Sequence, residues 1–185
     1  GLGAASHTDV AREAGVSVPA VFFYFRTRAL LVDAVLDEVA GLYLGLAEQH
    51  LRPDAPTPQA LLDFARAFAR SVDEQPDHAR VWLDWSTAIR DELWPRYLEF
   101  QERVIGAIAA ALERGRHAGS VAADADADDE ARLFVGAAYV VTQMKFAGTP
   151  PAKVERFLET LVRSAVGRYA AGRAGSPAAR TRSPR

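Results

Sequence analysis

Apolar residues recur every three or four positions along most of the chain, which is the spacing of one face of an α-helix. No strand is evident, so the pattern predicts an all-α fold. The long helices are expected at residues 28–50, 58–74, 77 to at least 86, 95–116, 128–147 and 151–170.

Prolines divide the chain into parts. Pro53, Pro56 and Pro58 interrupt the helical pattern after residue 50. We expect a head and its connector helix at residues 1–50, and a helical body at residues 51–170. Residues 171–185 are rich in Arg, Ser, Pro and Gly, which predicts a disordered tail. A weak, non-specific contact of that tail with nucleic acid is the alternative.

Within the head, residues 9–25 predict two short helices joined by a tight turn. Thr8 can cap the first helix, and Gly15 follows its last residue, where a left-handed backbone favours glycine. Ser17 can cap the second helix, whose first turn holds Pro19. Two helices joined by such a turn are typical of the DNA-binding helix-turn-helix. An ordinary corner between two helices of an all-helical domain is the alternative.

Helical spacing also assigns faces. In the second short helix Val21, Phe22 and Phe25 should turn inward, which leaves nearer the outside Pro19, Ala20, Phe23 and Tyr24. The helix at 28–50 should face inward through Leu31, Val35, Val39, Leu42 and Leu46, with Tyr43 beside them. The last helix has a broad apolar face, of which one edge can serve its own core and another a partner.

The composition is that of a globular protein, with 49% hydrophobic and 25% charged residues in 185. The absence of cysteine excludes disulfides and cysteine-based zinc sites. No signal peptide or membrane-spanning run is visible, so we expect a cytoplasmic location and no membrane partner. The formal net charge of −2 is unusual for a DNA-binding protein. Local placement against phosphates matters more than the total.

The sequence offers no catalytic or metal-binding pattern, and we expect no enzyme activity, metal or cofactor. The acidic run Asp124, Asp126, Asp128 and Asp129 lacks the central Gly and distal Glu of a calcium loop, and a helix N-terminus explains it better. His7 is expected to be a surface or phosphate-contacting residue. The alternative to a DNA-binding protein is a helical ligand-binding or scaffolding protein whose head does not read DNA.

The run from Asp9 to Leu31 resembles the DNA-binding domain of the TetR family, whose usual pattern is I-A-x-x-A-G-V-S-x-x-x-x-Y-x-x-F. Tyr24 directly before Phe25 departs from it and resembles one subgroup, the LuxR/HapR/SmcR-type quorum-sensing regulators of vibrios, with V-S-V-A-T-V-F-N-Y-F-P-T-R. Further along, W-L-D-W-S at 82–86, R-D-E-L-W-P at 90–95 and A-L-E-R-G at 111–115 are similar to that subgroup's motifs. The resemblance extends to about Tyr169.

This resemblance implies a homodimeric transcriptional regulator that binds a palindromic operator in double-stranded DNA. Phosphates would be held by Ser17, Tyr24 and Arg28, and bases or the thymine methyl would be faced by Val18, Pro19, Ala20 and Phe23. Thr8 completes the DNA-binding set. Phe23 stands where vibrio relatives often carry Asn, so operator preference is expected to differ. A first helix and a basic arm precede the position of Gly1 in the family, and we expect them to be missing here.

The resemblance also implies a mostly apolar effector pocket in the body. Its wall would comprise Tyr43, Leu46, Trp82, Tyr97, Gln101, Ile108, Phe134 and Ala138. Gln101 and the Tyr43 hydroxyl would orient a small apolar effector by one or two hydrogen bonds. A filled core without a cavity is the alternative. The last two helices would form the dimer interface, through Phe157, Leu158, Leu161 and Val162.

Overall fold

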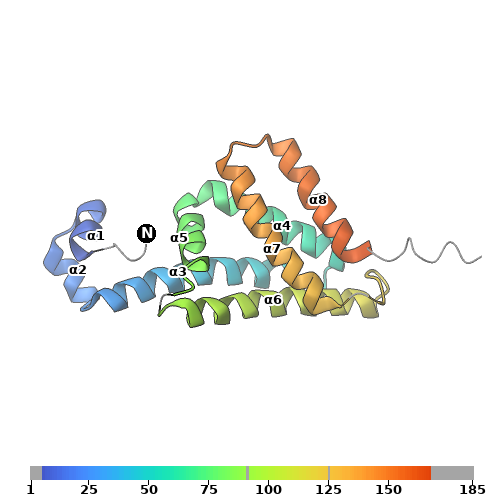
Figure 1. The fold of residues 1–185 in the computed structure, drawn as a ribbon, viewed down its shortest axis with the longest axis horizontal. Helices are drawn as coiled ribbons and strands as arrows, with labels where there is room; N and C mark the ends of the chain where they lie inside the picture. Colours follow the sequence, from blue (N-terminus) through green and yellow to red (C-terminus); the bar gives the residue numbers. More distant parts are fainter. Residues whose placement is uncertain (1–5, 91, 125, 168–185) are drawn as a thin grey trace, which may run out of the picture.

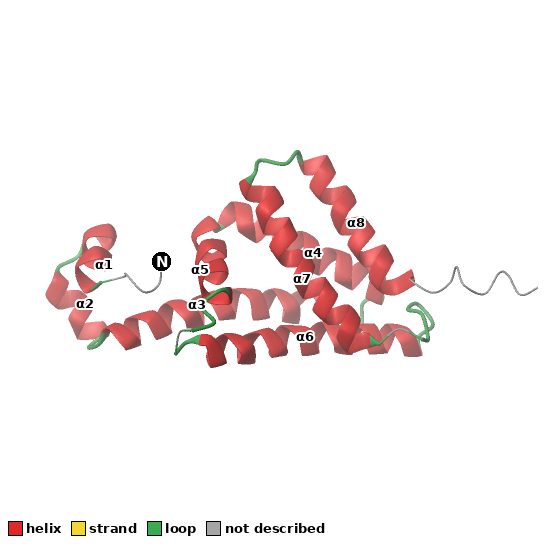
Figure 2. Ribbon diagram, in the orientation of Figure 1, coloured by secondary structure: helices red, strands yellow, loops and turns green. Residues whose placement is uncertain are grey.

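The computed structural model describes residues 6–90, 92–124 and 126–167, and every regular element in those ranges is an α-helix (Figures 1 and 2). This confirms the all-α prediction. The helices are α1 (His7–Ala14), α2 (Val18–Tyr24), α3 (Arg28–His50), α4 (Thr57–Glu74), α5 (Pro76–Ser86), α6 (Trp94–His117), α7 (Ala127–Phe146) and α8 (Pro151–Gly167). Each of the six long helices begins within one residue of its predicted start. The predicted tail at 171–185 lies outside the described residues.

The head and the body share helix α3. Figure 1 shows α1 and α2 at one end of α3, away from the other helices, while the rest of α3 runs into the body beside α6. Helix α4 lies at the centre of the body and contacts α3, α5, α6, α7 and α8. The connector helix is therefore both a part of the body core and the support of the head.

The body core is apolar and well filled. Trp85, Tyr97, Leu36, Leu61 and Ile108 are among its fully buried side chains. Helix α4 supplies small residues to this core, since Ala60, Ala65, Ala67 and Ala69 are buried as well. Alanines allow five neighbouring helices to approach the central helix closely.

The A-L-E-R-G motif at the end of α6 fixes the start of α4. The Thr57 hydroxyl donates to the carbonyl oxygen of Ala111 at 3.1 Å, and Arg114 donates to that of Leu51 at 2.7 Å. A Cβ atom on Gly115 would lie 2.8 Å from the Thr57 Cβ and 2.5 Å from a methyl group of Val121. Glycine is therefore required at position 115 by the close approach of α6, α4 and the loop that follows α6.

The predicted inward stripe of α3 is partly wrong. Leu31 and Val39 are buried, but Val35 is 36% exposed, while Leu36 and Tyr43 are almost fully buried. Leu42 and Leu46 are only half-buried. The reason is that α3 packs against α4, α5 and α6 together, so its buried face is broader than a single stripe and centred elsewhere.

Candidate DNA interface and effector pocket

The turn between α1 and α2 has the predicted geometry. Gly15 has a φ of 66°, and its N–H bonds to the end of α1. The Ser17 hydroxyl accepts the N–H of Ala20 at 3.3 Å, and Pro19 lies in the first turn of α2. The cap of α1 differs, because the helix begins at His7 and Ser6 Oγ accepts the Asp9 N–H at 3.2 Å. Thr8 is thus an exposed residue of the first turn and not the cap.

His7 ties the two ends of the helix-turn-helix together. Only 8% of it is exposed, and its Nε2 donates to the Phe25 carbonyl oxygen at 2.6 Å. Its ring lies parallel to that of Phe22, with the centroids 4.0 Å apart. The prediction of a surface or phosphate-contacting histidine is therefore wrong. Phe22 was expected inside, but it is 48% exposed, because it lies at the edge of the head with its ring stacked on that of His7.

The remaining head residues predicted to contact DNA lie on the outside. Phe23 and Tyr24 are 76% and 75% exposed, and their rings meet edge to face at 5.3 Å. Pro19 and Arg28 are also exposed, whereas Val18 and Ala20 are half-buried. The head thus presents an apolar and aromatic face on α2, flanked by Ser17 and by the first residue of α3.

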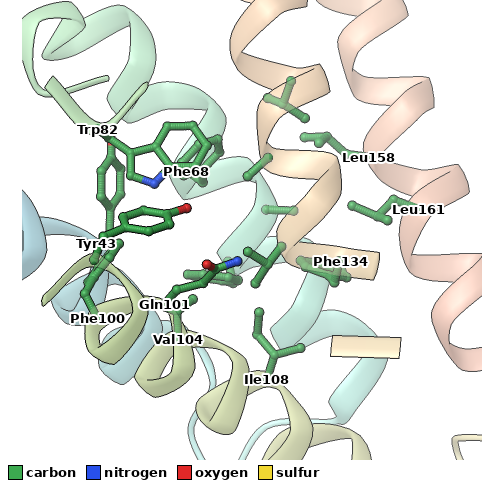
Figure 3. A pocket seen from close by; sticks show the side chains of 16 residues that line it. Tyr43, Phe68, Trp82, Phe100, Gln101, Val104, Ile108, Phe134, Leu158 and Leu161 are labelled. Carbon is green, nitrogen blue, oxygen red and sulfur yellow. The ribbon is translucent and has the colours of Figure 1, made fainter. Parts of the chain in front are cut away.

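The body contains a cavity of about 60 Å³ lined almost entirely by apolar atoms (Figure 3). Seven predicted residues line it: Tyr43, Trp82, Tyr97, Gln101, Ile108, Phe134 and Ala138. Leu46 does not, because it packs against the core elsewhere on α3. The sequence analysis missed the other lining residues, which are Phe64, Ala65, Phe68, Phe100, Val104, Val135, Val141, Leu158 and Leu161. The helical spacing of Phe64, Ala65 and Phe68 on α4 is the signal that could have found these three residues.

Few polar groups reach this cavity. The Tyr43 hydroxyl is buried and has no hydrogen-bond partner among the described residues. Burial raises the pKa of Tyr43, so the hydroxyl stays protonated and can donate. The Tyr97 hydroxyl is already paired with that of Tyr139 at 2.6 Å. Gln101 brings the only side-chain amide among the described lining residues.

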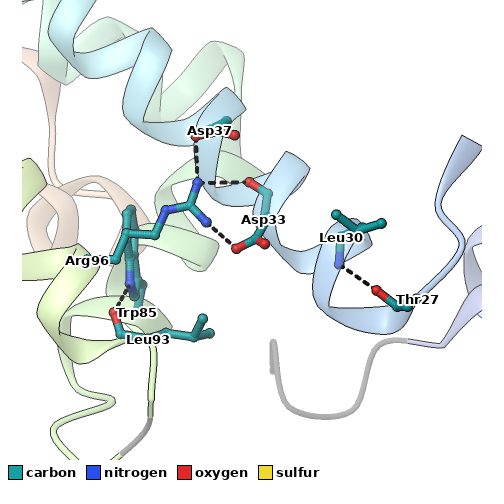
Figure 4. A network of polar contacts seen from close by, with 7 residues as sticks. All are labelled: Thr27, Leu30, Asp33, Asp37, Trp85, Leu93 and Arg96. Carbon is teal, nitrogen blue, oxygen red and sulfur yellow. Dashed lines mark hydrogen bonds and ion pairs between the residues drawn. The ribbon is translucent and has the colours of Figure 1, made fainter.

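Helix α6, which carries Tyr97, is joined to the connector helix α3 through Arg96, the residue before Tyr97 (Figure 4). Arg96 forms ion pairs with the carboxylates of Asp33 and Asp37, and it donates to the Asp33 carbonyl oxygen at 3.1 Å. Trp85 Nε1 donates to the Leu93 carbonyl oxygen at 3.1 Å, which holds the end of α5 to the start of α6. The first turn of α6 therefore touches the pocket and the head end of α3 together.

The surface of α7 and α8 corrects part of the predicted dimer interface. Leu158 and Val162 are 2% and 6% exposed and belong to the core of the chain itself, so they offer little surface to a partner. Phe157 and Leu161 are half-buried. The exposed apolar residues are on α7 instead, where Leu133 is 51% and Val140 is 42% exposed. Helical spacing alone did not show which neighbouring helix covers each face of α7 and α8.

Two further predictions concern ions and membranes. Asp126 caps α7 by accepting the N–H groups of Asp128 and Asp129 at 2.9 and 3.1 Å, which confirms the helix N-terminus interpretation of these acids. In the described ranges no group of three or more His, Cys, Asp or Glu residues is arranged to hold a metal ion. No helix there is long and apolar enough to cross a membrane.

An exposed helix-turn-helix carried on an all-helical body defines the class as helix-turn-helix DNA-binding proteins. The family model for bacterial regulatory proteins of the tetR family matches residues 1–35. The HTH-type transcriptional regulator LuxR of Vibrio harveyi is 31% identical over 145 residues, which are 76% of this chain and 69% of that protein. The chain belongs to the TetR family. It is a DNA-binding transcriptional regulator, which is not a class of enzymes.

Solved structures share the fold. The MbdR regulator from Azoarcus sp. CIB superposes with a TM-score of 0.70 at 18% identity, over 90% of this chain and 89% of that chain. SCO3833, a TetR regulator family member from Streptomyces coelicolor A3, gives a TM-score of 0.64 at 16% identity, over 90% and 83%. At these identities the likeness concerns the fold alone.

Proposed function

We propose that the chain acts as a homodimer on a palindromic operator, and that a small, mostly apolar effector in the body pocket changes its affinity for DNA. The observation that carries this proposal is the cavity beside Tyr43. This residue belongs to the connector helix, and its buried hydroxyl has no partner among the described residues. A buried polar group without a partner is costly, and a ligand acceptor would satisfy it. The proposed site of action is the cytoplasm, where the regulated DNA would lie.

The size of the cavity suggests how binding would be coupled to the head. A cavity of about 60 Å³ is smaller than the roughly 150 Å³ that holds benzene, so an effector requires an expanded pocket. Expansion at Tyr97 displaces the first turn of α6, and Arg96 transmits that displacement to Asp33 and Asp37 of α3. The effector shifts the equilibrium only by its differential affinity for the two arrangements.

On the DNA side, Ser17, Tyr24 and Arg28 would contact phosphates, with Thr8 at the edge of the same surface. Val18, Pro19, Ala20 and Phe23 would face the bases. A two-fold dimer would place two copies of α2 about one helical turn of DNA apart, which requires an operator that is roughly palindromic.

The partner in this dimer would meet α7 and α8. Leu133 and Val140 lie seven residues apart, so they share one face of α7, and Gly136 between them has open space around its Cβ position. A second copy can therefore approach α7 closely at Gly136, with Phe157 and Leu161 of α8 at the side of the contact.

The pocket is tested with a matched pair of probes, acetophenone and ethylbenzene, which differ by one carbonyl acceptor. Wild type should bind acetophenone more tightly, by roughly fivefold for one hydrogen bond of about 1 kcal/mol. Tyr43→Phe should lose this preference and keep its affinity for ethylbenzene. Ala138→Phe, which fills the cavity, should bind neither probe. Binding is followed by tryptophan quenching, because Trp82 lines the cavity.

A response of operator affinity to acetophenone in the wild type, absent in Ala138→Phe, would connect the pocket to DNA. Equal quenching by both probes in the wild type and Ala138→Phe would show that the probes bind elsewhere. The core would then be filled, and Tyr43 would be a packing residue.

A further inference from the structure

The wall of the body cavity is buried almost everywhere. Of its 16 lining residues, the only ones that are half-buried are Gln101, Val135, Ala138 and Leu161. Gln101 lies on α6, while Val135 and Ala138 lie on α7, and these two helices pack against each other. The cavity therefore comes nearest to solvent at the seam between α6 and α7.

This seam is fastened on both sides of Gln101. On one side, the Arg132 guanidinium donates to both carboxylate oxygens of Glu102, at 2.7 and 3.1 Å, and joins α7 to α6. On the other side, the hydroxyls of Tyr97 and Tyr139 lie 2.6 Å apart and join the same two helices. Figure 3 shows the Gln101 side chain directed into the cavity from α6. No hydrogen bond within the described ranges fixes that side chain.

The two fastenings differ in strength. Tyr97 and Glu102 are five residues apart, so the fastenings enclose about 7.5 Å of α6. The hydroxyl pair is largely shielded, since Tyr97 is 1% exposed. The side chains of Arg132 and Glu102 are 47% and 56% exposed, so water and salt compete with their ion pair. The seam is therefore held least firmly at the ion pair, next to Gln101.

We propose that an effector enters the pocket between α6 and α7, that the Gln101 side chain is the gate at this entrance, and that the Glu102–Arg132 ion pair holds the entrance closed. The inference rests on the proposed effector pocket and adds its route of entry. The rival route passes between α7 and α8 at Leu161, but the proposed dimer covers that side of α7. Opening the seam moves α6 and α7 apart by a small displacement of packed helices, as lids and gates of binding sites commonly do.

The test measures the rate constants of probe binding by stopped-flow tryptophan quenching. Ethylbenzene is the probe, because it forms no hydrogen bond that the loss of the Gln101 amide would remove. Arg132→Ala should raise the association and dissociation rate constants together, by up to about fivefold, the factor that one exposed ion pair is worth. Its equilibrium constant should stay unchanged, because the entrance lies on the path and not in the bound state. Gln101→Ala should raise the association rate constant as well.

Arg66→Ala is the matched control. Arg66 also joins two helices that line the cavity, α4 and α8, through its ion pair with Glu155, and its loss should leave both rate constants unchanged. Faster binding in Arg66→Ala, or unchanged rates in both Arg132→Ala and Gln101→Ala, would overturn this entrance alone. A changed equilibrium constant of Arg132→Ala at an unchanged association rate constant would show that Arg132 shapes the bound state and does not close the entrance. Absent quenching in the wild type, or equal quenching in Ala138→Phe, would overturn the pocket and its entrance together.

Discussion

Replacing Arg96 by Ala is expected to loosen the head end of α3. Arg96 joins α6 to Asp33 and Asp37, which lie in the part of α3 nearest the head. Leu36 and Val39 hold the following turns of α3 in the body core. Without Arg96, this part of α3 loses its ion pairs with α6, so we expect the head to move more freely relative to the body.

The magnitude follows from exposure. The Arg96 side chain is 30% exposed, and those of Asp33 and Asp37 are 48% and 77% exposed. Pairs this open to solvent contribute roughly 0.2–1 kcal/mol each. For the two pairs together, we expect Arg96→Ala to lower the free energy of unfolding by about 0.4–2 kcal/mol. Its effect on the orientation of the head should be larger than this modest loss suggests.

Arg66→Ala is the matched control. Its side chain is 34% exposed and also has two acidic partners, Asp63 and Glu155, but its ion pair between helices joins α4 to α8. Both substitutions should cost similar stability in urea unfolding. Only Arg96→Ala should weaken the response of operator affinity to a pocket probe.

The assay uses the absence of cysteine in the chain. A single cysteine introduced at the exposed Glu13 of α1 carries one spin label per head. Electron–electron distance measurement on the dimer should give a broader distribution for Arg96→Ala than for the wild type or Arg66→Ala. Equal distributions in all three proteins would refute the role of Arg96. Failure to detect any distance between heads would contradict the dimer.

Four further outcomes are expected. Gly115→Ala should destabilise the protein by about 1–3 kcal/mol in urea unfolding, because the new Cβ would overlap Val121 and Thr57. Gly106→Ala is the control: the Cβ position of Gly106 on the same helix is open, and this substitution should stabilise the protein by roughly 0.5–1 kcal/mol. Leu133→Glu with Val140→Glu should give a folded monomer in sedimentation, while Leu98→Glu, at a leucine that is 41% exposed on α6, should stay dimeric; a dimeric double variant would exclude this face of α7. Arg28→Ala should weaken binding to every DNA sequence and reduce the slope of log K against log salt by about one; a change of preferred sequence would contradict a phosphate contact. Burial raises the pKa of Tyr43 and of Tyr97 above the ordinary value of 10, and the hydrogen bond to Tyr139 raises that of Tyr97 further. The free energy of unfolding should therefore be independent of these groups below pH 10 and fall as the pH rises above it. The fall should be less steep in Tyr43→Phe, as measured by urea midpoints.

Local signals predicted the helices well, because proline and capping residues mark their ends. The roles of Gly15, Ser17 and Pro19 depend on contacts with residues only a few positions away, so they could be predicted from the sequence. His7 was not, because its partner, the Phe25 carbonyl oxygen, lies 18 residues away. Ser6 and Thr8 are residue types that can both cap a helix, and in the structure Ser6 Oγ accepts the Asp9 N–H.

In the body, too, contacts between residues far apart in the sequence could not be predicted, as the pocket and the surface of α8 show. Trp82 of α5 and Tyr97 of α6 were placed at the cavity, yet Phe64 and Phe68 of α4 and Phe100 of α6 were missed. Five helices surround α4, and periodicity does not tell which of them faces a given side chain. The same ambiguity placed Leu158 and Val162 at the dimer seam, although α4 and α7 cover this side of α8.

The first turn of α6 connects these observations. Arg96 and Tyr97 are consecutive, so their side chains leave the helix about 100° apart. One pairs with the connector helix and the other lines the cavity. Because the two residues are consecutive in one helical turn, a movement of that turn at Tyr97 also moves Arg96. Under the proposed function, an effector that enlarges the pocket at Tyr97 would act on the same helical turn of α6 that pairs with α3.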